Sequence, residues 1–123
     1  MKEKLNLNAF TFTLGVVKCV HWTAKKHSHH KILDDLYDEL YDSFDEFVES
    51  YIGKFKEDFY IGEIEMSERE RYSSFDSVED VSETLKDFCD YLKPFSEKDS
   101  ELSSVFDDIK NSINKAMYLL RMD

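Results

Sequence analysis

One long amphipathic helical pattern between His30 and Ile52 constrains the fold more than any other feature of this sequence. Apolar residues recur there every three or four positions and form one broad stripe on a helical wheel. The stripe consists of Leu33, Leu36, Tyr37, Leu40, Tyr41, Phe44, Phe47, Val48 and Tyr51. Because only one side of this helix is apolar, that side must be buried against other elements. Gly53 follows the last residue of the pattern and predicts the end of the helix.

Three further segments show helical spacing of apolar residues and predict helices over about 8–26, 77–93 and 100–121. Ser77 and Asp80 have the spacing of a capping box at the start of the third predicted helix, and Pro94 predicts its end. Gly15 inside the first predicted helix suggests a close contact with a neighbouring helix. The predicted buried positions outside the second helix are Phe10, Leu14, Val17 and either Val20 or His21, then Val81, Leu85, Phe88 and Leu92, and finally Leu102, Val105, Phe106, Ile109, Ile113, Met117 and Leu120.

The connections between these helices predict the topology. The connection between the first and second helices is short, as is the one between the third and fourth. Residues 53–76 have no clean period and are expected to form a long crossover between the second and third helices. With only three Gly and one Pro, turn formers are scarce, which disfavours a sandwich or barrel. We therefore expect a single all-α domain over 1–123, a ferritin-like four-helix bundle with one crossover.

Composition excludes several classes of partner. The formal net charge is −11, and nucleic-acid binding depends on Lys and Arg that neutralise phosphates, so DNA binding is disfavoured. We find no apolar run long enough for a membrane span and no signal-peptide core, which favours a cytoplasmic protein. Cys19 and Cys89 lie far apart in apolar patterns and are expected to be reduced, buried thiols.

His21, His30, Asp45 and Glu49 form a candidate metal-ligand set. Two imidazoles and two carboxylates suit divalent iron, with manganese or zinc as alternatives. His30 and Asp45 are fifteen residues apart on one predicted helix, which separates them by about 22 Å within one chain. One subunit therefore cannot bring all four residues to one ion. The set predicts both a metal site and an oligomer in which two subunits share it.

The stretch from Val20 to Lys54 resembles the ferroxidase segment of Dps-type mini-ferritins. In that family a histidine followed by tryptophan ends the first helix, and a second histidine opens the next. His21, Trp22 and His30 match these residues, while Asp45 and Glu49 match the family's Asp-x-x-x-Glu element. The resemblance implies a hollow shell built from two-fold dimers, in which iron is oxidised at the dimer interfaces. It also implies that the two histidines come from one subunit and the carboxylates from its partner.

The sequence departs from the family pattern in three respects. Only nine residues separate His21 from His30, no arginine follows Glu49, and the chain lacks a lysine-rich tail. The compact form is similar to small Dps-like proteins found in bacteriophage genomes, which implies a host-cell cytoplasmic location.

Several alternatives remain open at this stage. Trp22 would either intercept oxidising equivalents or simply pack. His27 and His29 are expected to be exposed in the turn, although His29 could replace His30 if the register shifts. The competing function is a ferritin-like oligomeric scaffold or interaction protein without ferroxidase activity.

Overall fold

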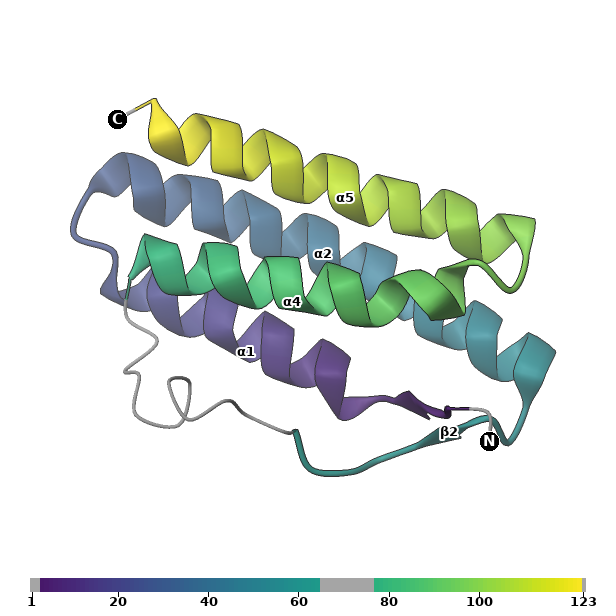
Figure 1. Cartoon of the computed structure of the whole chain (residues 1–123). Coiled ribbons are helices and arrows are strands. Elements are labelled where there is room, and N and C mark those ends of the chain that lie inside the picture. Colours follow the sequence, from purple (N-terminus) through teal and green to yellow (C-terminus); the bar gives the residue numbers. More distant parts are fainter. Residues whose placement is uncertain (1–2, 65–76, 123) are drawn as a thin grey trace.

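The computed structural model describes residues 3–64 and 77–122, and most of this part of the chain is helical (Figure 1). The described helices are α1 (Asn8–Thr23), α2 (His27–Phe55), α4 (Val78–Ser96) and α5 (Ser100–Arg121). Two short strands, β1 (Leu5–Asn6) and β2 (Phe59–Tyr60), pair in parallel. The prediction of an all-α fold with these four helices is confirmed, apart from this small two-stranded sheet.

The four helices pack side by side, with α2 and α4 each contacting both α1 and α5. Figure 1 shows α1 antiparallel to α2, and α4 antiparallel to α5, while α2 and α4 run in the same direction. The start of α4 therefore lies at the opposite end of the bundle from the end of α2. The predicted crossover over 53–76 is described only as far as Ile64, and its residues 65–76 lie outside the described part of the chain.

The apolar faces of all four helices meet in one core. Every apolar position predicted for the third helix is buried, as are most of those predicted for the others. Leu14, Tyr37, Val48 and Met117 are only partly buried, and Tyr41 is 49% exposed. Phe10 is central to this core, since its ring lies 5.2 Å from the ring centroids of both Phe44 and Phe88. These rings connect α1 with α2 and α4.

The turn between the first two helices comes three residues earlier in the chain than predicted. α1 ends at Thr23 and α2 begins at His27, so His27–His29 belong to the helix and not to the turn. Ala24 and Lys26 have extended backbone, with ψ angles of 127° and 132°, and reverse the chain between them. Residues 27–30 contain neither Gly nor Pro, and the His30 N–H donates to the Lys26 carbonyl at 3.0 Å. The helix therefore begins directly after Lys26.

Two predicted helix ends are wrong. α2 continues through Gly53 to Phe55, whose ring packs 5.0 Å from that of Tyr51, and the helix ends before Lys56 at a φ of 44°. α4 continues through Pro94 to Ser96 because Phe95 is buried in the core. Tertiary packing thus outweighs the local preference of both residues. By contrast, the capping box of Ser77 and Asp80 is confirmed, with both reciprocal hydrogen bonds present.

Two expectations about the outer face of α1 are also wrong. A Cβ added to Gly15 would meet nothing within 4 Å, so no neighbouring helix of the described chain requires glycine there. Cys19 is exposed, whereas Cys89 is partly buried, and both thiols are free. Burial raises the pKa of the Cys89 thiol to about 11. None of the described helices combines the length and apolar character that crossing a membrane requires.

A polar network joins three segments at one end of the bundle. The Lys98 ammonium donates to the Tyr51 hydroxyl and to the Asp58 carboxylate, both at 2.7 Å, and the Tyr51 hydroxyl donates to Asp58 at 3.1 Å. The same ammonium lies about 5 Å from the ring centroids of Tyr51 and Phe55. The network therefore connects the end of α2 and the chain after it to the turn between α4 and α5.

This network should make the fold sensitive to alkaline pH. Burial raises the pKa of Tyr51 above its ordinary 10.0. Burial alone would lower the pKa of Lys98, but hydrogen bonds to Asp58 and Tyr51 outweigh it and raise that pKa above 10.5. The folded chain then binds more protons than the unfolded chain above about pH 10, so its stability must fall as pH rises.

We expect urea unfolding to show a constant free energy up to about pH 9 and a decline between about pH 10 and pH 11. A Tyr51→Phe/Lys98→Met variant should show a shallower decline over the same interval. An equal slope in both proteins would contradict this assignment.

Candidate functional site

His21 and His30 lie against each other where α1 ends and α2 begins. Their rings stack with centroids 3.9 Å apart and an interplanar angle of 26°. Nδ1 of His21 lies 2.8 Å from the His30 carbonyl oxygen, and Nδ1 of His30 lies 2.9 Å from the His21 carbonyl oxygen. The three-residue turn produces this reciprocal arrangement, which pins the two helix ends together.

The reciprocal bonds determine which nitrogen of each ring is protonated. A carbonyl oxygen only accepts hydrogen bonds, so each Nδ1 must carry a proton and donate it. In the neutral imidazole, Nε2 then keeps its lone pair and is available to a metal ion. Holding a ligating histidine through Nδ1–H is also the usual way in which proteins orient it. The pair is therefore built as two nitrogen donors in fixed positions.

Asp34 lies beside this histidine pair, although the ligand set predicted from the sequence did not include it. Its Oδ1 is 3.8 Å from Nε2 of His21, and its side chain is 50% exposed. His30 and Asp34 are four residues apart and so share one face of α2. That spacing was the available signal. It carried little weight because α2 has many acidic residues at similar spacings.

The structure does not bring Asp45 and Glu49 to the histidines within one subunit. Both carboxylates are exposed, and they lie one turn apart on α2. Because α2 is continuous from His27 to Phe55, Asp45 is about 22 Å along the helix from His30. Within residues 3–64 and 77–122 of a single subunit, no group of three or more His, Cys, Asp or Glu side chains is arranged to hold a metal ion.

His27 and His29 are not part of the stacked pair. His30, rather than His29, is the residue beside His21, so the register alternative considered from the sequence is not realised. His27 is exposed as expected, and its ring centroid lies 6.4 Å from that of His30. His29 is only partly buried and sits within α2.

An exposed aromatic strip adjoins the histidine pair, made of Trp22 on α1 with Tyr37 and Tyr41 on α2. Trp22 is 66% exposed, so packing within its own subunit does not account for it. The Lys18 ammonium lies 4.6 Å from the Tyr37 ring centroid and 5.8 Å from that of Trp22. Tyr37 and Tyr41 lie 6.3 Å apart with nearly parallel rings. The strip is an exposed aromatic surface next to the histidine pair.

We expect the neutral form of both histidines to be the Nδ1–H tautomer, because their carbonyl partners accept only. Long-range proton–nitrogen correlation spectra of the imidazoles would report this directly. His30→Ala should also lower the free energy of unfolding by about 1 kcal/mol through loss of the hydrogen bond from its Nδ1–H to the His21 carbonyl. The exposed-site variant Asp45→Asn should change it by less than about 0.5 kcal/mol. An Nε2–H tautomer at either ring would refute the geometry.

Comparison with known proteins gives one match. No curated protein and no solved structure matches the chain significantly. Residues 21–120 match the model of DUF5856, described as a family of unknown function. The matched region includes both histidines, Trp22, Asp45, Glu49, all of α2 and α4, and α5 up to Leu120. Since the match covers most of its length, the chain belongs to this family of unknown function, DUF5856.

Proposed function

We propose that this protein oxidises Fe(II) at sites shared between two subunits and sequesters the ferric product, as Dps-type mini-ferritins do. The observation that carries the proposal is the reciprocal pairing of His21 and His30, which leaves two Nε2 atoms as fixed donors. In the proposed site, Asp45 and Glu49 of a second subunit complete the ligand set. Iron is the favoured substrate, and manganese and zinc are the alternatives that the same ligands accept.

The ligand types suit the chemistry of ferrous iron. Neutral imidazole nitrogens and anionic carboxylate oxygens bind Fe(II) and leave positions for an oxidant. With peroxide as oxidant, two Fe(II) ions each give up one electron, the O–O bond breaks, and two protons complete two water molecules. Fe(III) is then held by carboxylates. The exposed acidic side chains of α2, which include Asp35, Asp38, Asp42 and Glu46, would supply a surface for it.

The spacing along α2 specifies how the subunits would pair. A two-fold axis across α2 makes the two copies of this helix antiparallel, so that each His30 meets the partner's carboxylate end. The axis must then cross α2 midway between His30 and the Asp45–Glu49 pair, close to Tyr37 and Tyr41. The aromatic strip lies at that point and would be covered by its counterpart. Exposed aromatic patches of this kind commonly mark interfaces between proteins.

The direction of the helices also supports the proposal. α2 and α4 run in parallel, which fits the ferritin-like bundle with one long crossover. Trp22, exposed beside His21, could intercept oxidising equivalents that leave the site. Two-fold dimers of this kind would in turn assemble into a hollow shell that encloses the mineral.

The decisive measurement is the initial rate of Fe(II) oxidation, with peroxide and with oxygen. In Asp45→Asn/Glu49→Gln the rate should fall to that of buffer. The matched control is Asp42→Asn/Glu46→Gln, which removes two exposed carboxylates with the same spacing on the same helix and should retain the wild-type rate. Equal rates in wild type and both variants, no faster than buffer, would overturn the ferroxidase proposal.

A mixing experiment tests whether two subunits share each site. His21→Ala/His30→Ala and Asp45→Asn/Glu49→Gln should each be inactive alone. Co-expressed in equal amounts, they form mixed dimers in which one of the two sites is intact, so about a quarter of the wild-type rate should return. Sites contained within single subunits would show no recovery.

A second prediction concerns the interface itself. Tyr41→Lys should dissociate the dimer, because it sets two ammonium groups near the two-fold axis, and should abolish iron oxidation with it. Tyr118→Lys on α5 is the matched control, since Tyr118 is 56% exposed and belongs to neither of the two helices that carry the strip. Sedimentation velocity gives the mass of each variant. A Tyr41→Lys protein of unchanged mass and activity would exclude this mode of pairing.

The alternative function is a ferritin-like oligomeric scaffold or interaction protein that lacks the chemistry. The exposed aromatic strip favours it, because an interface explains these residues without any metal. Under this alternative, Tyr41→Lys would still dissociate the oligomer, whereas Asp45→Asn/Glu49→Gln would leave every property of the protein unchanged.

A further inference from the structure

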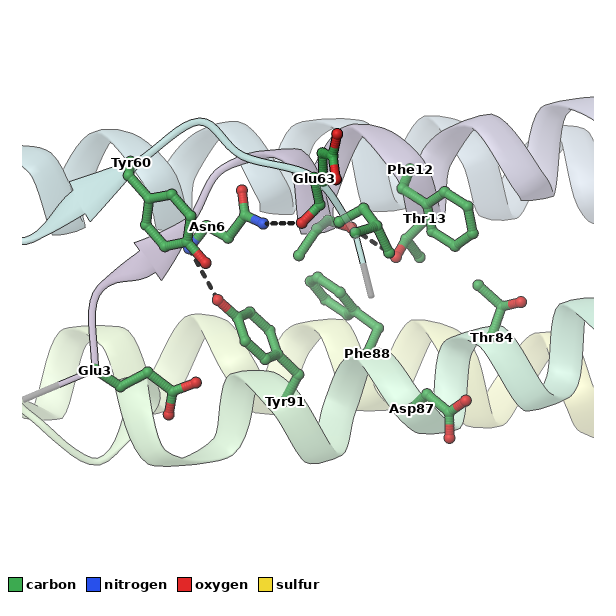
Figure 2. Close-up of a pocket in the computed structure, with 12 residues that line it drawn as sticks. Glu3, Asn6, Phe12, Thr13, Tyr60, Glu63, Thr84, Asp87, Phe88 and Tyr91 are labelled. Carbon is green, nitrogen blue, oxygen red and sulfur yellow. Dashed lines mark hydrogen bonds between the residues drawn. The ribbon is translucent and has the colours of Figure 1, made fainter. Parts of the chain in front are cut away.

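A pocket of about 550 Å³ lies at the opposite end of α1 from the histidine pair (Figure 2). It is bounded by β1 and the first half of α1, by the chain that follows β2, and by the middle of α4. Its volume is within the usual range for pockets that bind small molecules. Thr13 on its wall precedes His21 by eight residues, so the two sites are about 12 Å apart along α1.

Asn6 fixes the wall formed by the chain after β2. Its side-chain amide donates to the carbonyl oxygens of Gly62 and Glu63 at 3.4 and 3.2 Å, and its Oδ1 accepts from the Gly62 N–H at 3.1 Å. The Asn6 backbone N–H donates to the Tyr91 hydroxyl at 2.8 Å. Asn6 is itself 5% exposed. Together these bonds hold the strand pair and α4 at a fixed separation. The pocket is therefore already formed without a ligand.

Aromatic rings form much of the pocket surface. Phe12 and Phe88 come from α1 and α4, while Tyr60 and Tyr91 stand at the other end, as Figure 2 shows. Burial, and to a smaller extent the nearby Glu3 carboxylate, raises the pKa of the Tyr91 hydroxyl, which therefore stays neutral. Faces of aromatic rings attract cations, and a ring system that is shielded from water does so more strongly.

Among the described residues that line the pocket, the charged side chains are acidic. Glu3 and Glu63 contribute carboxylates at the proposed ligand position, and none of these described lining residues is Lys, Arg or His. Such a surface repels phosphates and carboxylates and attracts cations. Aromatic rings next to carboxylates favour a weakly hydrated organic ammonium ion over a metal ion, since the organic cation also buries apolar surface.

Thr84 adds a polar group inside the pocket that the protein does not use. It is 6% exposed, and Figure 2 shows its side chain rising from α4 toward α1. Its hydroxyl has no hydrogen-bond partner among the described residues, whereas the hydroxyl of Thr13 opposite donates to the Ala9 carbonyl at 2.8 Å. A hydroxyl that borders the pocket and has no partner among these residues is free to bond to a ligand that enters it.

We propose that this pocket binds a small organic ammonium ion that also carries a hydrogen-bonding group. The ammonium lies against the aromatic rings near Glu3 and Glu63, and the polar group of the ligand bonds to the Thr84 hydroxyl. This binding is independent of iron oxidation, because it uses no residue of the proposed iron site.

Choline is the first probe, since it combines a quaternary ammonium with a hydroxyl. Its neutral isostere, 3,3-dimethylbutan-1-ol, has the same shape without the charge. Titrations of the wild-type protein, followed by proton–nitrogen correlation spectra, should show saturable shifts centred on Asn6, Phe88 and Tyr91. Choline should bind at least about tenfold more tightly than the isostere. Absence of saturable binding up to about 20 mM choline, or equal binding of the two compounds, overturns the proposal.

Two variants test the residues assigned to the ligand. Glu3→Gln/Glu63→Gln should weaken choline binding severalfold and bring its affinity closer to that of the isostere. Thr84→Val keeps the shape of the side chain and should weaken both compounds without lowering the melting temperature. Glu97→Gln, an exposed carboxylate outside the pocket, is the control and should bind like wild type. Unchanged affinity in both pocket variants would show that choline binds elsewhere and would overturn the assignment.

Discussion

α2 buries its apolar stripe against α1 on one side and α5 on the other, and the rest of the bundle is arranged around that packing. At 29 residues it is about 43 Å long. α1 and α4 cover only parts of that length, and the space next to them at one end is taken by the β1–β2 pair and the Lys98 network. The other end is where the three-residue turn brings His21 and His30 together. The strand pair and the Lys98 network at one end, and the histidine pair at the other, thus both depend on α2 being longer than α1 and α4.

The sequence patterns predict the helices well and their ends poorly. Apolar residues at helical spacing identify α2, α4 and α5 because burial of one face dominates the energy of each helix. Gly53 and Pro94 predict helix ends by local preference, but Phe55 and Phe95 pack against the core beyond them and extend both helices. The capping box was predictable because Ser77 and Asp80 bond to each other's backbone within four residues. The β1–β2 pair was not, since two-residue strands leave no period to detect.

The candidate site was likewise predictable from the sequence only in part. Residue types and spacing identified His21 and His30, and helix geometry alone predicted that Asp45 and Glu49 could not reach them. The stacking of the rings and their bonds to each other's carbonyl oxygens depend on the exact path of the turn, which no pattern encodes. Asp34 was missed for a related reason, because one carboxylate among many on an acidic helix gains meaning only from the direction of a neighbouring ring. The pocket beside α4 was invisible in sequence, since its walls come from four separate segments.

Because α2 is uninterrupted, its length also sets the distance between the two sites of the proposed dimer. In the proposed dimer each helix carries a nitrogen end and a carboxylate end, so the distance between the two iron centres equals the length of helix between them, about 22 Å. At that separation one peroxide molecule cannot touch both centres, so the two electrons that it takes must both come from Fe(II) bound at the same centre. Inserting two full turns between His30 and Asp45 would move the centres apart without disturbing either one, whereas inserting half a turn would rotate every carboxylate away from its partner's imidazoles. In such a dimer, the number of helical turns inserted between His30 and Asp45 would therefore decide which insertions this family tolerates.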